Sequence, residues 1–221
     1  MAFGPIMKFK IEDLNIKLAP ITKESLPDLV EGMQKASVMQ SILFHSAQTI
    51  ESEEEWFRNK TEERDSLVWG VWVEGVDGDK LIGNTILSDI KQKHIISSES
   101  GCALTNKDYW GRGIISAAHK ARTWYAFNQY GMTRIKSAVL QCNPASKRTL
   151  EKSGYYVTHV ERNVQFVRGK LEHLDWLECI NPDDWAWRQW WVYDRPTKKA
   201  IEARAVTKKA MSWAEKNVKL L

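Results

Sequence analysis

The chain has 221 residues, with 32 Lys and Arg against 28 Asp and Glu and a formal net charge of +4. That length suffices for one domain with a substantial core and an appended element. No run of about eighteen apolar residues occurs, which argues against a membrane-spanning helix. Because residues 1–5 also lack the basic, apolar and small-residue order of a signal peptide, we expect a soluble, cytoplasmic protein.

The three cysteines and five histidines are scattered along the chain. Neither the spacing of a disulfide framework nor that of a zinc site occurs, so we expect no metal. Each cysteine is expected to be a small buried hydrophobe in a strand or at a strand end. The cysteines are Cys102, Cys142 and Cys179.

Two helices are predicted after a first strand. Alternating apolar residues predict that strand over residues 15–20. Apolar side chains at helical spacing then predict a helix that continues to Met33, and a second helix that carries Trp56 and Phe57. Hydroxyl side chains that can cap these helices precede both: Thr22 or Ser25 for the first, Thr49 or Ser52 for the second.

Strand-like runs and a further helix fill the middle of the chain. A Gly-containing turn over residues 75–79 predicts a hairpin between the first two runs. Gly131 predicts the end of the central helix. The predicted strands cover residues 67–74, 80–90, 94–104, 155–167 and 174–180, and the central helix covers residues 114–129.

Gly111 and Gly113 stand where the strand over residues 94–104 is followed by the central helix. Glycine lets the backbone come close to a ligand, and the first N–H groups of a helix, reinforced by its dipole, favour an anion such as pyrophosphate. A glycine pair before a helix can also simply allow the chain to turn in a loop, without binding any ligand. Taken alone, the pair leaves both interpretations open.

A second segment follows the central helix. Residues 135–146 predict a strand followed by a loop that contains Asn143 and Ser146. Residues 147–155 predict a helix that ends at a glycine and is followed by a new strand. Tyr-Trp-Gly-Arg-Gly and Asn-x-x-Ser together resemble the acetyl-CoA core of the GNAT family of N-acetyltransferases. The sequences of these two motifs are most similar to those of the RimJ/RimL-like branch, the ribosomal-protein-alanine acetyltransferases. The resemblance spans residues 14–180.

The resemblance implies an α/β (α+β) class with the acyl-CoA N-acyltransferase fold, a central, mostly antiparallel mixed sheet flanked by helices. It implies an acetyltransferase domain over residues 1–180, followed by an extension over residues 181–221. The implied activity is transfer of acetyl from acetyl-CoA, the acyl-donor cosubstrate, to a primary amine by direct attack in a ternary complex. The amine belongs to a protein N-terminus or to a small molecule.

The resemblance also implies a set of cofactor-binding residues. Main-chain amides from Arg112 to Ser116 hold pyrophosphate in the family, and Asn143 contacts the pantetheine arm, although a strand-end Asn equally forms an Asx turn. The Arg112 side chain contacts phosphate or is solvated. Trp110 and Ile115 depart from the usual family pattern. The full set is Leu104, Thr105, Trp110, Gly111, Arg112, Gly113, Ile114, Ile115, Ser116, Asn143 and Ser146.

Two residues are candidates for the proton transfers. Ser146 matches a hydroxyl that acts near the sulfur as general acid in related enzymes, and its other interpretation is a helix cap. Glu99 matches the Glu of the family's Glu-x-Gly strand, and it could accept the amine proton, directly or through water, if burial raises its pKa. Its other interpretation is a solvated carboxylate on an edge strand. Gln165 corresponds to a carboxylate position in some relatives and cannot act as a base.

An acidic run and a basic, Trp-rich C-terminal region each have more than one interpretation, so the sequence does not identify the amine acceptor or the binding partners. The acidic run over residues 51–55 either attracts a cationic amine or complements the dipole of its helix. Residues 185–191 contain four tryptophans, with Asp183 as a helix cap, and an amphipathic helix is predicted beyond Pro196. Residues 194–221 hold eight Lys or Arg against three Asp or Glu.

This basic, Trp-rich extension has three interpretations. It packs on its own domain, it forms a homodimer interface, or it binds nucleic acid or the ribosome in a catalytically silent protein. No membrane partner is expected.

Overall fold

The computed structural model describes residues 3–43, 48–76, 78–92 and 95–221, which divide into two compact units. Unit 1 contains the chain up to Ser88, residues 101–118 and residues 217–221; unit 2 contains residues 89–100 and 119–216. Strands β4 (Lys80–Gln92) and β5 (Ile96–Leu104) each contain residues of both units. The domain boundary expected after residue 180 stays a prediction.

Antiparallel strands form the sheet of unit 1. The strands are β1 (Met7–Ile11), β2 (Leu14–Ala19), β3 (Leu67–Val73) and β9 (Lys219–Leu220). β1 lies between β9 and β2, and β3 lies between β2 and β4. The predicted first strand is therefore the second, because Met7 and Phe9 alternate with lysines and form a buried strand of their own.

The predicted hairpin between β3 and β4 is confirmed by their antiparallel pairing. Its turn includes Asp77, and the strand predicted next begins at His94; both residues lie outside the described residues.

The helices of unit 1 are α1 (Leu26–Met33), α2 (Ala36–Met39) and α3 (Ile50–Glu62). Thr49 caps α3, since its Oγ1 accepts a 3.2 Å hydrogen bond from the Ser52 N–H. Apolar residues of both longer helices, including Leu29 and Trp56, pack with Val68 and Leu81 of the sheet. The two predicted helices are confirmed, and the short α2 was not predicted.

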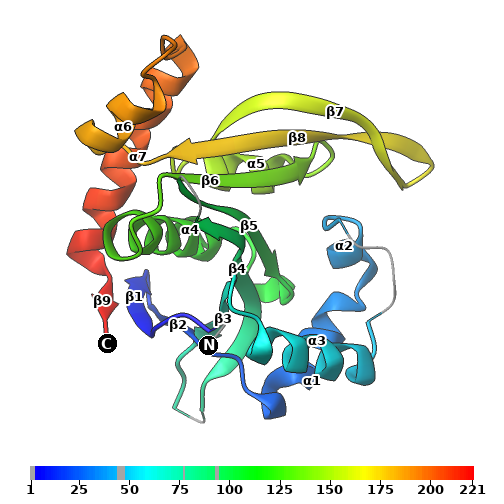
Figure 1. Cartoon of the computed structure of the whole chain (residues 1–221). Coiled ribbons are helices and arrows are strands. Elements are labelled where there is room, and N and C mark those ends of the chain that lie inside the picture. The colour runs from blue at the N-terminus through cyan, green and yellow to red at the C-terminus, as the bar shows by residue number, and fades with distance from the viewer. Residues whose placement is uncertain (1–2, 44–47, 77, 93–94) are drawn as a thin grey trace. The chain divides into compact units, whose positions relative to one another are not determined.

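Unit 2 contains the parallel part of the sheet. β6 (Arg134–Leu140) pairs in parallel with β5 and antiparallel with β8 (Lys170–Ile180), and β8 pairs antiparallel with β7 (Tyr156–Val167). The strands β7 and β8 form a long hairpin (Figure 1). The predicted class, a mostly antiparallel mixed sheet with flanking helices, is confirmed.

The predicted central helix is confirmed, with a change of winding near its end. It runs as α4 (Ile114–Trp124) and continues as a π-helical turn over Tyr125–Gln129. Gly131 follows with φ of +75°. The other helices are α5 (Pro144–Glu151), α6 (Asp184–Trp190) and α7 (Lys198–Asn217).

The three cysteines differ in burial. Cys179 is buried in β8, and burial raises the pKa of its thiol to about 12. Cys102 is partly buried in β5, whereas Cys142 is exposed in the turn after β6. The expectation of a buried residue is therefore wrong for Cys142, because the strand ends before it.

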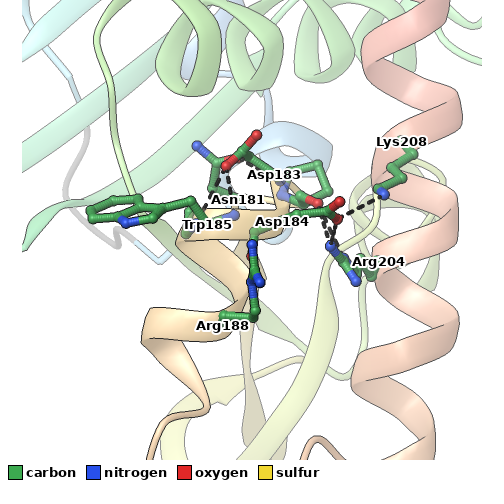
Figure 2. A network of polar contacts seen from close by, with 9 residues as sticks. Asn181, Asp183, Asp184, Trp185, Arg188, Arg204 and Lys208 are labelled. Carbon is green, nitrogen blue, oxygen red and sulfur yellow. Dashed lines mark hydrogen bonds and ion pairs between the residues drawn. The ribbon is translucent and has the colours of Figure 1, made fainter.

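Residues 181–216 of the C-terminal extension belong to unit 2, whereas its last residues add β9 to the sheet of unit 1. The Asp183 side chain caps α6 by accepting a 2.9 Å hydrogen bond from the Trp185 N–H, as predicted. The carboxylate of Asp184 lies 2.5 Å from Arg204 and 3.5 Å from Lys208, both on α7 (Figure 2). On the buried side of α7 the residues are small: Ala200, Ala203, Thr207, Ala210 and Ala214.

We predict that Gly154→Ala destabilises the protein strongly. Gly154 has φ of +91°, and a Cβ there would lie 1.9 Å from Thr207 Oγ1 and 2.7 Å from the Thr207 backbone nitrogen. Strain and the clash with α7 together should cost at least about 3 kcal/mol in urea unfolding. Gly169, with φ of +79° and no heavy atom within 4 Å of the place a Cβ would take, is the control, and Gly169→Ala should cost about 1 kcal/mol. Equal losses would contradict close packing of α7 against this turn.

Candidate active site

The Gly turn of unit 1 has the backbone of an anion site. Gly111 and Gly113 both have φ of +79°, and beyond the chain neighbours of each glycine no heavy atom of the described residues lies within 4 Å of the position that a Cβ would take. The Ala117 N–H donates to Gly113 O at 3.0 Å, so the N–H groups of residues 114–116 precede the first bonded turn of α4. The residues present therefore fit a pyrophosphate held by main-chain amides.

Ile114 and Ile115 take different environments at the start of α4. Ile114 is fully buried, whereas Ile115 is only partly buried. Ile114 therefore supplies the core packing at the start of α4, and the bulky Ile115 side chain remains partly exposed. Both amides remain in the first turn of the helix.

Hydrogen bonds next to this turn involve three of the predicted cofactor residues, Leu104, Thr105 and Trp110. The indole N–H of Trp110 donates to Leu104 O at 2.9 Å. The Thr105 N–H and hydroxyl both donate to Ile82 O, at 2.9 and 3.1 Å. The structure thus gives these three predicted cofactor residues contacts that hold the end of β5 and the loop after it.

The Arg112 side chain is engaged within unit 1. Its guanidinium lies 2.5 Å from Asp13 and 3.6 Å from Glu12, at the turn between β1 and β2. The Arg112 side chain is therefore partly exposed and paired with surface carboxylates, and its contact with phosphate stays a prediction.

Asn143 and Ser146 lie together in unit 2. The Asn143 side-chain oxygen accepts a 3.1 Å hydrogen bond from the Ser146 N–H and caps α5. The helix cap is thus Asn143, and the capping interpretation of Ser146 is wrong. Ser146 occupies the third position of α5, with its side chain partly buried.

Glu99 lies on β5 opposite Lys136 of β6. Since β5 has neighbours on both sides, the edge-strand interpretation is wrong. The Glu99 side chain is 41% exposed, and its Oε1 lies 3.5 Å from Lys136 Nζ. The partial exposure gives water access to this carboxylate, which fits proton transfer through water better than direct transfer in a buried site.

The acidic run of α3 contains two different kinds of carboxylate. Hydrogen bonds from its own backbone N–H and from Thr49 lower the pKa of Glu51, as expected for an acid in a first helical turn. Glu53 is buried, and burial raises the pKa of its carboxyl. The helix-start interpretation therefore accounts for Glu51.

Sequence reasoning missed a buried carboxylate next to the Asn143–Ser146 segment. Asp175 on β8 accepts hydrogen bonds from Gln141 and Lys147, both at 2.7 Å. A charged residue between Leu174 and Trp176 in a strand was the available signal, because a buried Asp requires partners. Gln165, which stands at the position of a carboxylate in some relatives, is also buried and lies on β7.

The comparison with family models identifies the chain. The model described as the acetyltransferase (GNAT) domain matches residues 15–156. The chain belongs to the GNAT family. It is an acetyl-CoA-dependent N-acetyltransferase, related to curated N-acetyltransferases.

Two relatives come from Bacillus subtilis. The probable N-acetyltransferase YjcK is 28% identical over 128 residues, which are 58% of this chain and 69% of YjcK. The uncharacterized N-acetyltransferase YoaA is 30% identical over 121 residues, 55% of this chain and 66% of YoaA. Both alignments leave a large part of this GNAT chain unmatched.

Solved structures share the GNAT fold. RimJ of Mycobacterium smegmatis in complex with CoA-disulfide has a TM-score of 0.70 at 13% identity, covering 99% of this chain and 97% of RimJ. Spermidine N-acetyltransferase of Vibrio cholerae in complex with CoA and spermine has a TM-score of 0.67 at 16% identity, covering 75% of this chain and 95% of that protein. The likeness to RimJ includes the extension.

Neither a cluster of metal-ligating side chains nor a membrane-spanning helix occurs in the described part of the chain. Within residues 3–43, 48–76, 78–92 and 95–221, no three His, Cys, Asp or Glu side chains are grouped as metal ligands would be. The helices in the same ranges include none with the length and apolar character needed to cross a membrane.

We predict that the contribution of Asp175 to stability depends on pH. Burial would raise the pKa of this carboxyl, but the hydrogen bonds from Gln141 and Lys147 outweigh it and lower the pKa. A carboxylate with a lowered folded-state pKa stabilises the protein above its unfolded pKa of about 3.9, and the stabilisation is lost as pH falls through the folded value.

Asp175→Asn should therefore cost about 2 kcal/mol in urea unfolding at pH 7. The difference from wild type should persist to about pH 5 and shrink below about pH 4. A difference that stays constant down to pH 2 would contradict a paired, ionised Asp175.

Proposed function

We propose that this GNAT protein transfers an acetyl group from acetyl-CoA to a primary amine by direct attack in a ternary complex. The observation that carries the proposal is the turn at Gly111 and Gly113, both at φ of +79°, directly before the first N–H groups of α4. Main-chain amides from Arg112 to Ser116 hold the pyrophosphate. Asn143, which has a donor as well as the acceptor that caps α5, contacts the pantetheine arm.

Two side chains carry the proton transfers in this proposal. Acetyl-CoA supplies the thioester whose carbonyl carbon the amine attacks. Glu99 accepts the proton that the amine nitrogen loses as its bond to carbon forms, with water as a relay at this partly exposed carboxylate. As the carbon–sulfur bond breaks, the sulfur leaves as a developing thiolate, which the positive end of the α5 dipole favours. The Ser146 hydroxyl donates its proton to that sulfur, and a water molecule returns a proton to the Ser146 oxygen.

The acceptor belongs to the class of primary amines. Proteins of similar fold include a spermidine N-acetyltransferase and RimJ, so the fold alone accommodates different acceptors. We propose a protein N-terminus or a small-molecule amine, and parallel assays with spermidine and with short peptides separate the two.

We predict that Gly113→Ala weakens CoA binding. The new Cβ would strain the left-handed backbone of the turn that leads into the first N–H groups of α4. Calorimetric titration with acetyl-CoA and CoA should show at least about a tenfold loss of affinity, or 1.4 kcal/mol. Gly169→Ala, with the same φ and the same open surroundings on the β7–β8 turn, should bind as wild type does. Unchanged affinity in Gly113→Ala would overturn the pyrophosphate assignment.

We predict that Glu99→Gln and Ser146→Ala each lower kcat by roughly 100-fold, the usual contribution of a general acid or base. CoA affinity, measured by calorimetry, should be preserved in both, because neither side chain is assigned to phosphate binding. Glu151→Gln, an exposed carboxylate at the end of α5, serves as the control for lost charge. Wild-type turnover in both variants would refute the assigned roles.

The alternative function, a silent module that binds nucleic acid or the ribosome through its extension, has less support. Arg204 contacts Asp184, the Pro182 carbonyl and the ring of Trp187, and Lys208 contacts Asp184. These cations therefore stabilise the extension itself. The buried small residues of α7 favour packing within the chain over an aromatic binding face.

A further inference from the structure

A single carboxylate in the middle of β8 holds both ends of the segment that contains Asn143 and Ser146. Asp175 is only 2% exposed and lies on a strand with neighbours on both sides, opposite Val139 of β6 and Val160 of β7. An ionised group in such a place is costly unless it is paired and hydrogen-bonded. Its partners therefore show what the charge is used for.

The two carboxylate oxygens of Asp175 accept from two different donors. Oδ1 accepts a 2.7 Å hydrogen bond from Gln141 Nε2, at the start of the segment. Oδ2 accepts a 2.7 Å hydrogen bond from Lys147 Nζ, in the first turn of α5. Residues 141–147 are thus attached to β8 at both ends.

Inside this segment, backbone contacts complete the arrangement. The Gln141 N–H donates to His173 O at 2.9 Å, and the Asn143 N–H donates to Leu140 O at 2.8 Å. The Asn143 side chain then accepts from the Ser146 N–H. A displacement of either end of the segment would move the Asn143 amide and the Ser146 hydroxyl together.

We propose that Asp175 is a positioning residue, which holds the segment 141–147 so that Ser146 and Asn143 keep their places in the reaction. This inference rests on the proposed function. Only a carboxylate gives both donors an acceptor, since Asn in its place turns an N–H group toward one of them. A displacement of about 1 Å at reacting groups can cost as much as 100-fold in rate.

Stability alone does not explain a charge at this strand position between Leu174 and Trp176. Replacing a whole buried ion pair by apolar residues of similar volume is often neutral for stability, whereas removing only one partner is costly. Lys147 is 35% exposed, yet its ammonium turns inward to Asp175. The specific geometry of residues 141–147 is what the charge provides.

The first part of the test compares variants of the two partners. Asp175→Asn and Lys147→Met should each lower kcat/KM for acetyl-CoA by roughly 10- to 100-fold in the full chain. Lys147→Arg, which keeps the positive charge beside Asp175, should stay within about threefold of wild type. The double variant Asp175→Asn/Lys147→Met should be no worse than either single variant.

Glu178→Gln is the matched control on the same strand. Glu178 lies 3.7 Å from Arg134 and accepts a hydrogen bond from Tyr156, so its loss also removes a polar network, but it has no contact with residues 141–147. It should lower the unfolding midpoint and leave kcat/KM close to wild type. Equal catalytic losses in Glu178→Gln and Asp175→Asn would overturn the proposal, since general destabilisation would then explain both.

The second part of the test asks whether Asp175 acts through Ser146. In the Ser146→Ala background, Asp175→Asn should cause no further loss of kcat, because the group that it positions is absent. A full multiplicative loss would overturn this link.

If Ser146→Ala alone leaves kcat unchanged, the role of Ser146 in the proposed function fails, and the positioning role is decided on Asn143. Asp175→Asn should then weaken CoA binding in calorimetry, and the double variant with Asn143→Ala should bind no more weakly than Asn143→Ala alone. Undiminished CoA affinity in Asp175→Asn would overturn the positioning role in that case.

Discussion

The left-handed backbone at Gly111 and Gly113 is the constraint from which the candidate site of unit 1 follows. At φ of +79° a side chain would strain the chain at both positions, and the open space beside them would be partly filled. This turn sets the start of α4 at Ile114, with its first amides ahead of any helical acceptor. The burial of Ile114, the bracing of Leu104 by Trp110 and the ion pairs of Arg112 all hold the turn in place.

In unit 2 the corresponding constraint is polar. The segment after β6 has no apolar side chain that could anchor it, because Gln141, Cys142 and Asn143 are polar or exposed. Hydrogen bonds replace the apolar contacts: Asn143 caps α5, and Asp175 accepts from both ends of the segment. Ser146 is therefore held in a hydrogen-bonded segment whose position depends on Asp175 of β8, a residue far from the segment in the sequence.

The C-terminal extension has its own packing requirement. Small residues on one side of α7 allow a close approach, which Gly154 matches because any side chain there would meet Thr207. Asp184 joins α6 to α7 through Arg204 and Lys208 (Figure 2). Arg204 and Lys208, two of the eight basic side chains over residues 194–221, are therefore paired inside the extension.

Local signals in the amino-acid sequence were sufficient for the family, for the fold class and for most elements. Periodicity and caps identified α3, α4, α6 and α7, since these depend on residues a few positions apart, such as Thr49 with Ser52 and Asp183 with Trp185. The turn at Gly111 and Gly113 could also be predicted, because a left-handed backbone before a helix favours glycine at those positions. Strand β1 was missed although its alternation was present, and the two-residue β9 has too little pattern to find.

Contacts between distant residues could be found only in the folded chain. The pairing of Asp175 with Gln141 and Lys147, of Arg112 with Asp13, and of Glu99 with Lys136 joins segments separated by at least 28 positions. No periodicity relates such residues, since their proximity arises from strand pairing and helix packing. The residue types in the sequence therefore specified which chemistry is available, whereas the fold determined which partner each charged group meets, because a charge's partner is set by distance in space.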